Sequence, residues 1–244
     1  MTGQGDGMYT FEAMGGTEDA SWLEEARPGI LALFSIFKGQ AIYVGSAFMI
    51  DGIDQFATAR HVAESLRNYD EETYHEANAC ALVTGPNGGL VGILRLNMSP
   101  DENITSDLAT GHLDRAMLTA PLPYFQLTDV PVVVGESVTA IGHAFMPDEV
   151  IPLVNGVFSI EAQLRAIGSP VVEIHEKWTN LPSPSFMLNE EMPGGMSGGP
   201  IVRDSTGEIV GACSYGLVQN SGEHEPYCHG SMLGPLWQPY GYEA

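Results

Sequence analysis

The chain has 244 residues, 44% of them hydrophobic, which is enough for one large domain or for two cores of about 100 residues each. With 31 Asp and Glu against 9 Lys and Arg, the formal net charge is -22, and such a surface disfavours nucleic acid and anionic membranes as partners. No apolar run reaches the roughly 18–20 residues of a membrane span, and the N-terminus lacks the basic and apolar segments of a secretory signal, so we expect a cytoplasmic protein.

The first part of the chain predicts a tail, short helices and a group of strands. Residues 1–20 are mostly Gly-rich and polar and predict a flexible tail. The order Ser21-Trp22-Leu23-Glu24 has the spacing of a capping box, so a short helix is expected over about residues 21–26, with Pro28 ending it. One helical turn is expected at 62–68. Segments rich in β-branched and aromatic residues predict strands at 29–37, 41–50 and 55–59.

The rest of the chain consists of short strand-like segments between Gly, Pro and Asn turns. Pro-Leu-Pro at 121–123 is the best boundary between two halves, 21–123 and 124–244. With 29 Gly, 16 Pro and no long amphipathic helix, the pattern predicts an all-β barrel or sandwich. The predicted strands lie at 79–84, 90–96, 107–109, 115–119, 131–134, 137–141, 150–160, 170–175, 183–188, 200–203 and 208–215.

The cysteines and histidines predict no metal site and no cofactor. The chain has 3 Cys, an odd and low number that implies no disulfide framework, although pairing of Cys213 with Cys228 stays open. His224, Cys228 and His229 lie close together in the sequence, but their spacing is not a usual zinc pattern.

One serine stands among glycines in the stretch Pro193-Gly194-Gly195-Met196-Ser197-Gly198-Gly199-Pro200. A hydroxyl becomes a nucleophile when a base takes its proton, and the oxyanion formed on a substrate carbonyl needs backbone N–H donors. Glycines allow unusual backbone angles and leave room for a substrate, so Ser197 is a candidate nucleophile, and Gly195 and Ser197 are candidate oxyanion donors. A plain Gly-rich turn is the alternative. The elbow of α/β-hydrolases fits less well, because it requires a helix after the serine and a strand-like segment follows here.

A candidate base and a candidate acid lie in the first half. His61 follows a predicted strand in the block Thr58-Ala59-Arg60-His61-Val62, which would place it at the edge of a barrel. A carboxylate is then needed to hold the imidazole tautomer and to stabilise the imidazolium. Asp107 is favoured because Leu108-Ala109 follow it directly, whereas Asp114 has the better apolar alternation after it and stays open as the rival.

Taken together, these blocks resemble the trypsin-like (chymotrypsin-fold) serine peptidases, in particular bacterial members without zymogen activation. The resemblance rests on the order His, Asp, Ser, on a Thr-Ala-x-His block and on a Gly-x-Ser-Gly-Gly-Pro block. It extends over about residues 29–220. Three further blocks agree with it, namely Gly45-Ser46-Ala47-Phe48, the segment 134–142 and Gly211-Ala212-Cys213-Ser214-Tyr215-Gly216.

The resemblance implies a chymotrypsin-like fold of two six-stranded antiparallel β-barrels packed together, with few short helices. It implies a serine endopeptidase whose triad of His61, Asp107 and Ser197 lies in the cleft between the barrels. The substrate would be a peptide or protein, hydrolysed through an acyl-enzyme intermediate. A non-catalytic peptide-binding module on the same fold is the alternative function.

The same resemblance places candidate substrate-binding residues. Ser214, Tyr215 and Gly216 would hold the main chain of the substrate as an added strand. Glu191 lies where the family keeps the floor of its primary pocket, and a carboxylate there would favour Arg or Lys in the substrate. The alternative is that Glu191 and its neighbour Glu190 are an exposed loop pair, as loop carboxylates usually are.

One departure from the family pattern concerns activation. Members that are activated by cleavage carry an aspartate directly before the serine, paired with the newly formed N-terminus. Here that residue is Met196, which cannot form an ion pair, so we expect a protein that needs no N-terminal cleavage to become competent. Gating of the site by a regulatory protein partner is a further hypothesis.

Overall fold

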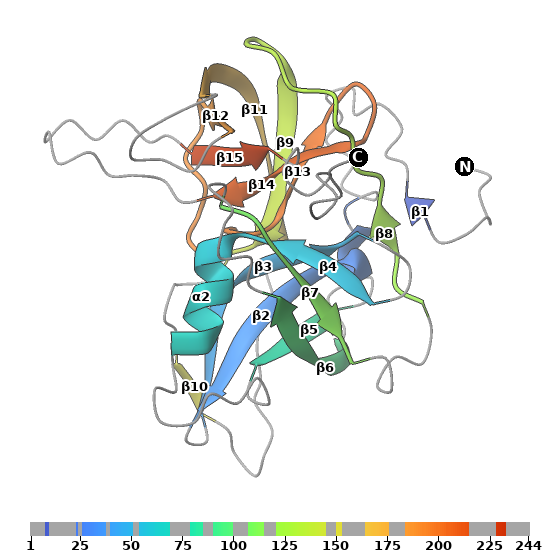
Figure 1. Ribbon diagram of the computed structural model, residues 1–244, viewed down its shortest axis with the longest axis vertical. Helices are drawn as coiled ribbons and strands as arrows, with labels where there is room; N and C mark the ends of the chain where they lie inside the picture. The colour runs from blue at the N-terminus through green and yellow to red at the C-terminus, as the bar shows by residue number, and fades with distance from the viewer. Residues whose placement is uncertain are drawn as a thin grey trace, which may run out of the picture.

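Two antiparallel β structures lie one above the other in the computed structural model, with the earlier strands below and the later strands above in Figure 1. Both are built from short strands, and the helical elements among the described residues are short. This confirms the predicted chymotrypsin-like all-β fold. The structure describes residues 8–9, 23, 26–37, 40–50, 54–68, 79–84, 90–99, 107–114, 121–144, 150–152, 164–175, 184–214 and 228–232.

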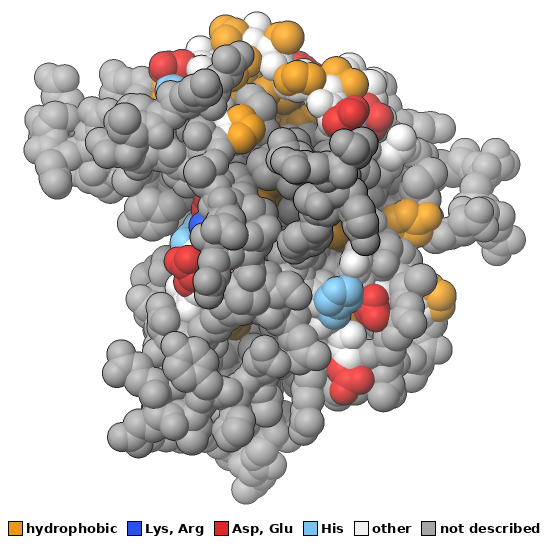
Figure 2. All heavy atoms as spheres, viewed as in Figure 1, with side chains coloured by type: hydrophobic (Ala, Val, Ile, Leu, Met, Phe, Trp, Pro, Cys, Tyr) orange, Lys and Arg blue, Asp and Glu red, His pale blue; other side chains and the backbone are white. Residues whose placement is uncertain are grey.

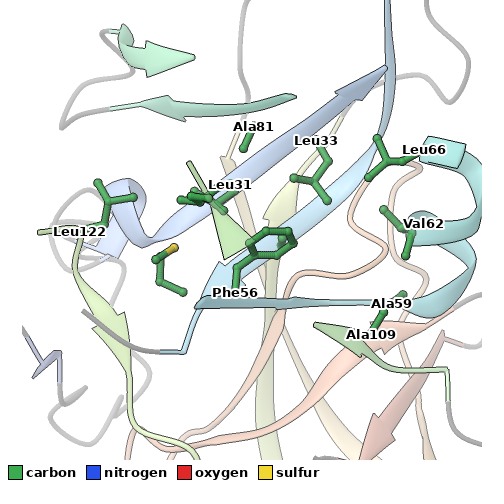
Figure 3. Close-up of a cluster of buried hydrophobic side chains, with 13 residues drawn as sticks. Leu31, Leu33, Phe56, Ala59, Val62, Leu66, Ala81, Ala109 and Leu122 are labelled. Carbon is green, nitrogen blue, oxygen red and sulfur yellow. The ribbon is translucent and has the colours of Figure 1, made fainter. Parts of the chain in front are cut away.

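The first structure is a sheet that closes on itself. Its strand order is β3-β2-β5-β6-β7-β4, and a further pairing of β3 with β4 closes the ring. Buried apolar side chains from opposite sides fill the interior, including Leu31, Leu33 and Phe56 (Figure 3). The strands are β2 (Ile30–Phe37), β3 (Gln40–Met49), β4 (Gln55–Thr58), β5 (Ala79–Thr84), β6 (Leu90–Ser99) and β7 (Ala109–Leu113).

A short helix, α2 (Arg60–Asn68), follows β4 directly and packs on the first barrel. Val62, Ala63 and Leu66 are buried in the core of the barrel, so the opposite face of the helix points outward (Figure 3). A 3-10 turn, η1 (Arg27–Gly29), precedes β2. Because Val62 and Leu66 fix the helix on the barrel, they also fix the position of the residues in its first turn.

The second structure is a closed six-stranded barrel. Its strand order is β11-β12-β15-β14-β13-β9, with every neighbouring pair antiparallel. The Ser197 turn lies between β12 and β13. The strands are β9 (Ser137–His143), β11 (Leu164–His175), β12 (Ser185–Leu188), β13 (Pro200–Arg203), β14 (Ile209–Ser214) and β15 (Cys228–Met232).

Two small elements connect the halves. β10 (Val150–Pro152) comes after β9 in the chain but pairs with β3 of the first sheet, at the lower end of Figure 1. β1 (Met8–Tyr9) pairs in parallel with β8 (Tyr124–Phe125), so part of the predicted tail is a strand. The division at residues 121–123 stays a prediction, and β10 is a strand from beyond it that joins the first sheet.

A shared apolar cluster joins the two barrels. It combines buried side chains of the first half, such as Phe48 and Leu108, with buried side chains of the second half, such as Ile141 and Val202. Burial of apolar surface between the halves is therefore what stacks one barrel on the other.

Two predicted strands differ from the structure: the one at 107–109 overlaps β7 only at Ala109, and the one at 131–134 is wrong. The segment 131–134 is not a strand, because its first residue, Pro131, has no donor N–H and Gly135 turns the chain with φ +89°. Val133 and Val134 are 62% and 61% exposed there. The predicted strand at 115–119 lies outside the described residues.

The surface of the described residues is acidic on the face shown in Figure 2. Red carboxylate side chains lie over both halves, and blue basic side chains are scarcely visible. No helix among the described residues is long and apolar enough to cross a membrane.

Candidate active site

His61 lies in the first turn of α2, immediately after the buried end of β4. Thr58 and Ala59 are buried, and Val62 anchors the helix on the core, so the imidazole is directed away from the barrel interior. The His61 side chain is 33% exposed. A strand end followed by a helix therefore presents this imidazole at the surface of the first barrel.

Asp107 holds His61 through both of its carboxylate oxygens. His61 Nδ1 lies 2.7 Å from Asp107 Oδ2, and the His61 backbone N–H donates to Asp107 Oδ1 at 2.9 Å. The hydroxyl of Ser214, from β14 of the second barrel, also donates to Asp107 Oδ2. The Asp107 side chain is only 7% exposed, so these three donors take the place of water around its charge.

The surroundings of Asp107 keep its carboxylate ionised. Burial pushes its pKa up, but the hydrogen bond and the charge of His61, the Ser214 hydroxyl and the His61 N–H together bring the pKa below its ordinary value. The N-terminus of α2 also favours a negative charge at this point. An ionised carboxylate can only accept hydrogen bonds, so His61 Nδ1 carries a proton, and in the neutral imidazole the lone pair is then on Nε2.

The rival carboxylate, Asp114, lies elsewhere. Asp107 precedes β7 and Asp114 follows it, so the two flank the strand at opposite ends. β4 runs antiparallel to β7, with Thr58 opposite Ala109 and Gln55 opposite His112. The Asp107 end of β7 therefore lies beside the end of β4 that leads into His61, and the Asp114 end lies beside the start of β4.

Ser197 sits in a turn whose backbone angles require glycine. Gly195 has φ +92° and Gly198 has φ +85°, in the region that other residues rarely adopt. The Met196 N–H donates to the Pro193 carbonyl at 3.3 Å, and the Gly198 N–H donates to the Cys213 carbonyl at 2.7 Å. The turn is thus closed on itself and also tied to β14.

Glycines bring the serine turn into direct contact with the segment that carries His61. A Cβ atom on Gly198 would lie 2.2 Å from the Ser46 carbonyl oxygen and 2.2 Å from Thr58 Oγ1. A Cβ atom on Gly45 would lie 2.7 Å from Val62 Cγ2 and 2.9 Å from the carbonyl oxygen of Ser197. The backbone after the serine and the backbone around the histidine therefore both pack against β3.

Backbone hydrogen bonding fixes the same contact. The Ser46 N–H donates to the Ser197 carbonyl at 2.7 Å, across the boundary between the halves. Met196 is fully buried in the core of the second barrel and packs on Gly142 of β9. The Ser197 side chain is partly exposed between these two supports.

The candidate substrate residues are described only in part. Glu191 is exposed on the segment after β12, as is Glu190, and its role in a pocket stays a prediction. Tyr215 and Gly216 lie outside the described residues. Within the described part of the chain, no group of three or more His, Cys, Asp or Glu side chains could hold a metal ion. Of the cluster at 224–229, His224 and the side chains of Cys228 and His229 lie outside the described residues.

Sequence reasoning missed a polar network beneath the Ser197 turn. The hydroxyls of Tyr43 and Ser46 both donate to the carbonyl of Gly195, and the His143 N–H donates to Ser46 Oγ. The signal was a serine within a strand, β3, that is almost entirely buried. A buried hydroxyl at such a place needs a partner, and here the partner comes from the other half of the chain.

Comparisons with known proteins agree with the fold. The model of the trypsin-like peptidase domain family matches residues 45–211. No curated protein is similar enough to count as a match.

Solved protease structures share the fold at low sequence identity. The active form of the Rv3671c protease from M. tuberculosis has a TM-score of 0.61 at 13% identity, over 88% of this chain and 80% of that one. The MamO protease domain from Magnetospirillum magneticum has a TM-score of 0.61 at 15% identity, over 86% and 95%. Deg5 has a TM-score of 0.62 at 15% identity, over 88% of each chain.

Proposed function

The chain belongs to the trypsin-like peptidase family and is a trypsin-like serine protease, and we propose that it is an endopeptidase whose triad is His61, Asp107 and Ser197. Its substrate is a peptide or protein. The observation that carries the assignment of the triad is the 2.7 Å contact between His61 Nδ1 and Asp107 Oδ2, beside the backbone that packs against the serine turn.

In the proposed reaction, Ser197 Oγ attacks the carbonyl carbon of the scissile bond while His61 Nε2 takes the hydroxyl proton. Asp107 accepts hydrogen bonds throughout, which keeps the imidazole in the tautomer with Nε2 free and stabilises the imidazolium. The imidazolium then gives its proton to the leaving amine, and the peptide C–N bond breaks. A water that His61 deprotonates then attacks the acyl carbon, the ester bond to Ser197 breaks, and the imidazolium returns its proton to Ser197 Oγ.

Negative charge develops on the substrate carbonyl oxygen during both steps. The N–H groups of Gly195 and Ser197 are the proposed donors to this oxyanion, since both belong to the turn that carries the nucleophile. Ser214 would keep a second role besides its hydroxyl contact to Asp107, because its main chain, with Tyr215 and Gly216, is the proposed partner of the substrate backbone.

Covalent labelling tests the proposed nucleophile. A fluorophosphonate probe should label the full chain, and Ser197→Ala should abolish both the label and the cleavage of unfolded, fluorescently quenched casein. Ser205→Ala is the matched control, because Ser205 lies on an exposed turn after β13 and should be labelled and cleave like the wild type. Mass spectrometry of the labelled peptide should place the adduct on residues 194–199.

Two outcomes would change the proposal. Equal labelling of wild type and Ser197→Ala would move the nucleophile elsewhere. No labelling of the folded wild type, together with saturable binding of peptides, would favour the alternative of a non-catalytic peptide-binding module.

The proposal includes gating by a partner protein. The support for it is the strongly acidic composition, with a net charge of -22, which suits a regulator with a basic surface. Full activity of the purified chain on unfolded casein, unchanged by salt, would remove the need for such a partner.

A further inference from the structure

The carbonyl of Gly195 is held by two hydroxyl groups from the other half of the molecule. Tyr43 Oη donates to Gly195 O at 2.6 Å, and Ser46 Oγ donates to it at 2.9 Å. Both residues lie on β3 of the first barrel, and they are only 1% and 0% exposed. These contacts reach the proposed oxyanion turn from the first barrel.

The network closes through the backbone of His143 at the end of β9. The His143 N–H donates to Ser46 Oγ at 2.9 Å, and Tyr43 Oη lies 3.0 Å from the His143 carbonyl oxygen. The two hydroxyls lie 3.1 Å apart. Both hydroxyl protons are thus directed at the Gly195 carbonyl, and Ser46 Oγ in turn accepts the amide proton of His143. A buried network in which each member has a partner is rigid, since removing one member leaves another buried polar group unpaired.

The donor character of Tyr43 does not depend on pH. Burial raises the pKa of its phenol far above the ordinary value, and the hydrogen bond with Ser46 lowers it only in part. The phenol therefore keeps its proton in the folded protein. Its ring packs edge-on against Phe34, with centroids 5.2 Å apart, so the aromatic ring and the hydroxyl serve separate contacts.

The geometry of the turn explains why the carbonyl matters. The Met196 N–H bonds the Pro193 carbonyl at 3.3 Å, and Gly195 has φ +92°, which together define a type II turn with Gly195 in its third position. Glycine at both central positions leaves such a turn free to rearrange. The N–H and the carbonyl carbon of Gly195 are attached to the same Cα, so a carbonyl that is held in place restricts where the N–H can lie.

We propose that Tyr43 and Ser46 are positioning residues, whose hydroxyls hold Gly195 so that its N–H is already in place to bind the oxyanion. This inference rests on the proposed function. The two side chains do not touch the reacting atoms and act only through Gly195. Because the anchor is built into the folded chain and uses no charge, it requires neither a cleaved N-terminus nor an ion pair.

Conservative variants separate the hydroxyls from the packing around them. Tyr43→Phe removes one oxygen and keeps the ring contact with Phe34, and Ser46→Ala removes the other hydroxyl. The matched controls are Tyr124→Phe, a partly buried tyrosine on β8, and the exposed Ser205→Ala. The readouts are kcat and KM on quenched casein, the maximal rate of fluorophosphonate labelling, and the pH dependence of kcat.

We expect the loss to fall on kcat. Removal of a complete oxyanion donor lowers kcat by roughly 10²–10³-fold, so each single variant should lose about 10-fold and the double variant about 100-fold. KM should stay within about twofold, because substrate binding precedes the development of charge. The maximal labelling rate should fall in parallel, and the pH profile should keep its shape, because His61 and Asp107 are untouched.

Two results would overturn the assignment, and they can be told apart. If the wild type is labelled but the folded double variant keeps kcat within about twofold, the hydroxyls do not position the donor and the proposed function stands. If the wild type is not labelled, the proposed function fails and this assignment fails with it. Should the double variant not fold, the two single variants decide, measured at a temperature where circular dichroism gives a native spectrum.

Discussion

The two halves of the molecule hold their parts of the site in different ways. In the first barrel, His61 is fixed by a side chain, because the Asp107 carboxylate bonds both its imidazole Nδ1 and its backbone N–H. In the second barrel, Ser197 is fixed through its backbone, because its carbonyl accepts the Ser46 N–H and the adjacent Gly198 packs against β3 without room for a Cβ atom.

This difference has a consequence for how the site forms. His61 and Asp107 both belong to the first half. Among the described residues, only Ser214 of their hydrogen-bonded group comes from the second half. The serine turn instead takes supports from both halves, from β14 and the Met196 cluster of the second barrel and from β3 of the first. It follows that the acid–base pair can form in the first barrel, whereas the nucleophile is correctly placed only after the two barrels have docked.

The largest effect is expected where the two backbones meet. Gly198→Ala would bring a Cβ atom to 2.2 Å from the Ser46 carbonyl oxygen and to 2.2 Å from Thr58 Oγ1, at a backbone φ of +85°. Backbone cannot move aside as a flexible side chain can, so we expect loss of more than about 4 kcal/mol in the free energy of unfolding and activity at background level. Denaturant unfolding and casein cleavage measure the two.

Gly135→Ala is the matched control for this variant. Gly135 also has a positive φ, of +89°, but nothing lies within 4 Å of its added Cβ atom. Only the strain of the left-handed conformation remains, which costs about 1 kcal/mol. Equal destabilisation by the two variants would contradict the idea that close contact between the halves holds the serine turn.

The next largest effect is expected at Asp107, whose side chain holds His61. Asp107→Asn should lower kcat by about 10³–10⁴-fold, because an amide can donate to the imidazole and favour the wrong tautomer. Stability should change far less than activity. Asp114→Asn is the control and should leave kcat within about twofold, since Asp114 lies at the other end of β7. A larger loss in Asp114→Asn than in Asp107→Asn would reverse the assignment of the acid.

Local pattern was sufficient to predict where His61 and Ser197 lie. A strand followed by a helical turn presents the histidine, and glycines around a serine predict a tight turn. Both signals arise within a few residues, so they can be seen in the sequence alone. The choice between Asp107 and Asp114 could not be made in this way. It depends on the register of β4 against β7, which pairs residues about 50 positions apart in the sequence.

The features that sequence reasoning missed are contacts between distant segments. Tyr43 has the pattern of an ordinary core aromatic, and the partner of its hydroxyl is 152 residues away. The apolar run at 131–134 looks like a strand, yet no neighbouring strand pairs with it among the described residues. The pairing of β10 with β3 is likewise set by tertiary docking, because three residues carry too little pattern to specify a partner.

Acid should weaken the junction between the barrels. His143 of β9 is fully buried, and its Nε2 lies 3.1 Å from the Ile30 carbonyl oxygen of β2. Burial lowers its pKa from 6.5 to about 4, and the charge of Arg27 acts in the same direction. Between pH 6.5 and about 4, His143 binds a proton in the unfolded chain but not in the folded chain. The contribution of His143 to the free energy of unfolding is therefore fully present above pH 6.5 and is lost as the pH falls to about 4.

The expected loss in the free energy of unfolding is about 3 kcal/mol, because each unit of pKa shift corresponds to about 1.36 kcal/mol. Denaturant unfolding at several pH values measures it, and His143→Asn should flatten the curve in this range. His112→Asn is the control, because His112 is exposed and should leave the curve unchanged. Asp107 changes the free energy of unfolding only at lower pH, because its pKa in the folded protein lies below the ordinary value of 3.8. A pH-independent stability from 6.5 to 4 in the wild type would contradict the burial of a neutral His143.

The smallest effect should come from Met196, which supports the serine turn from the second barrel. Met196→Ala removes a fully buried side chain from an apolar cluster and should cost about 2–3 kcal/mol in the free energy of unfolding. Because the lost contacts are apolar, the effect on stability and on activity should be the same at low and at high salt. Met196→Leu should restore most of the stability, since it refills the volume. A loss of stability in Met196→Ala that grows or shrinks with salt would mean that a charge, and not packing against Gly142, holds this side of the turn. The turn would then not be held by hydrogen bonds at Gly195 on one side and by apolar packing at Met196 on the other.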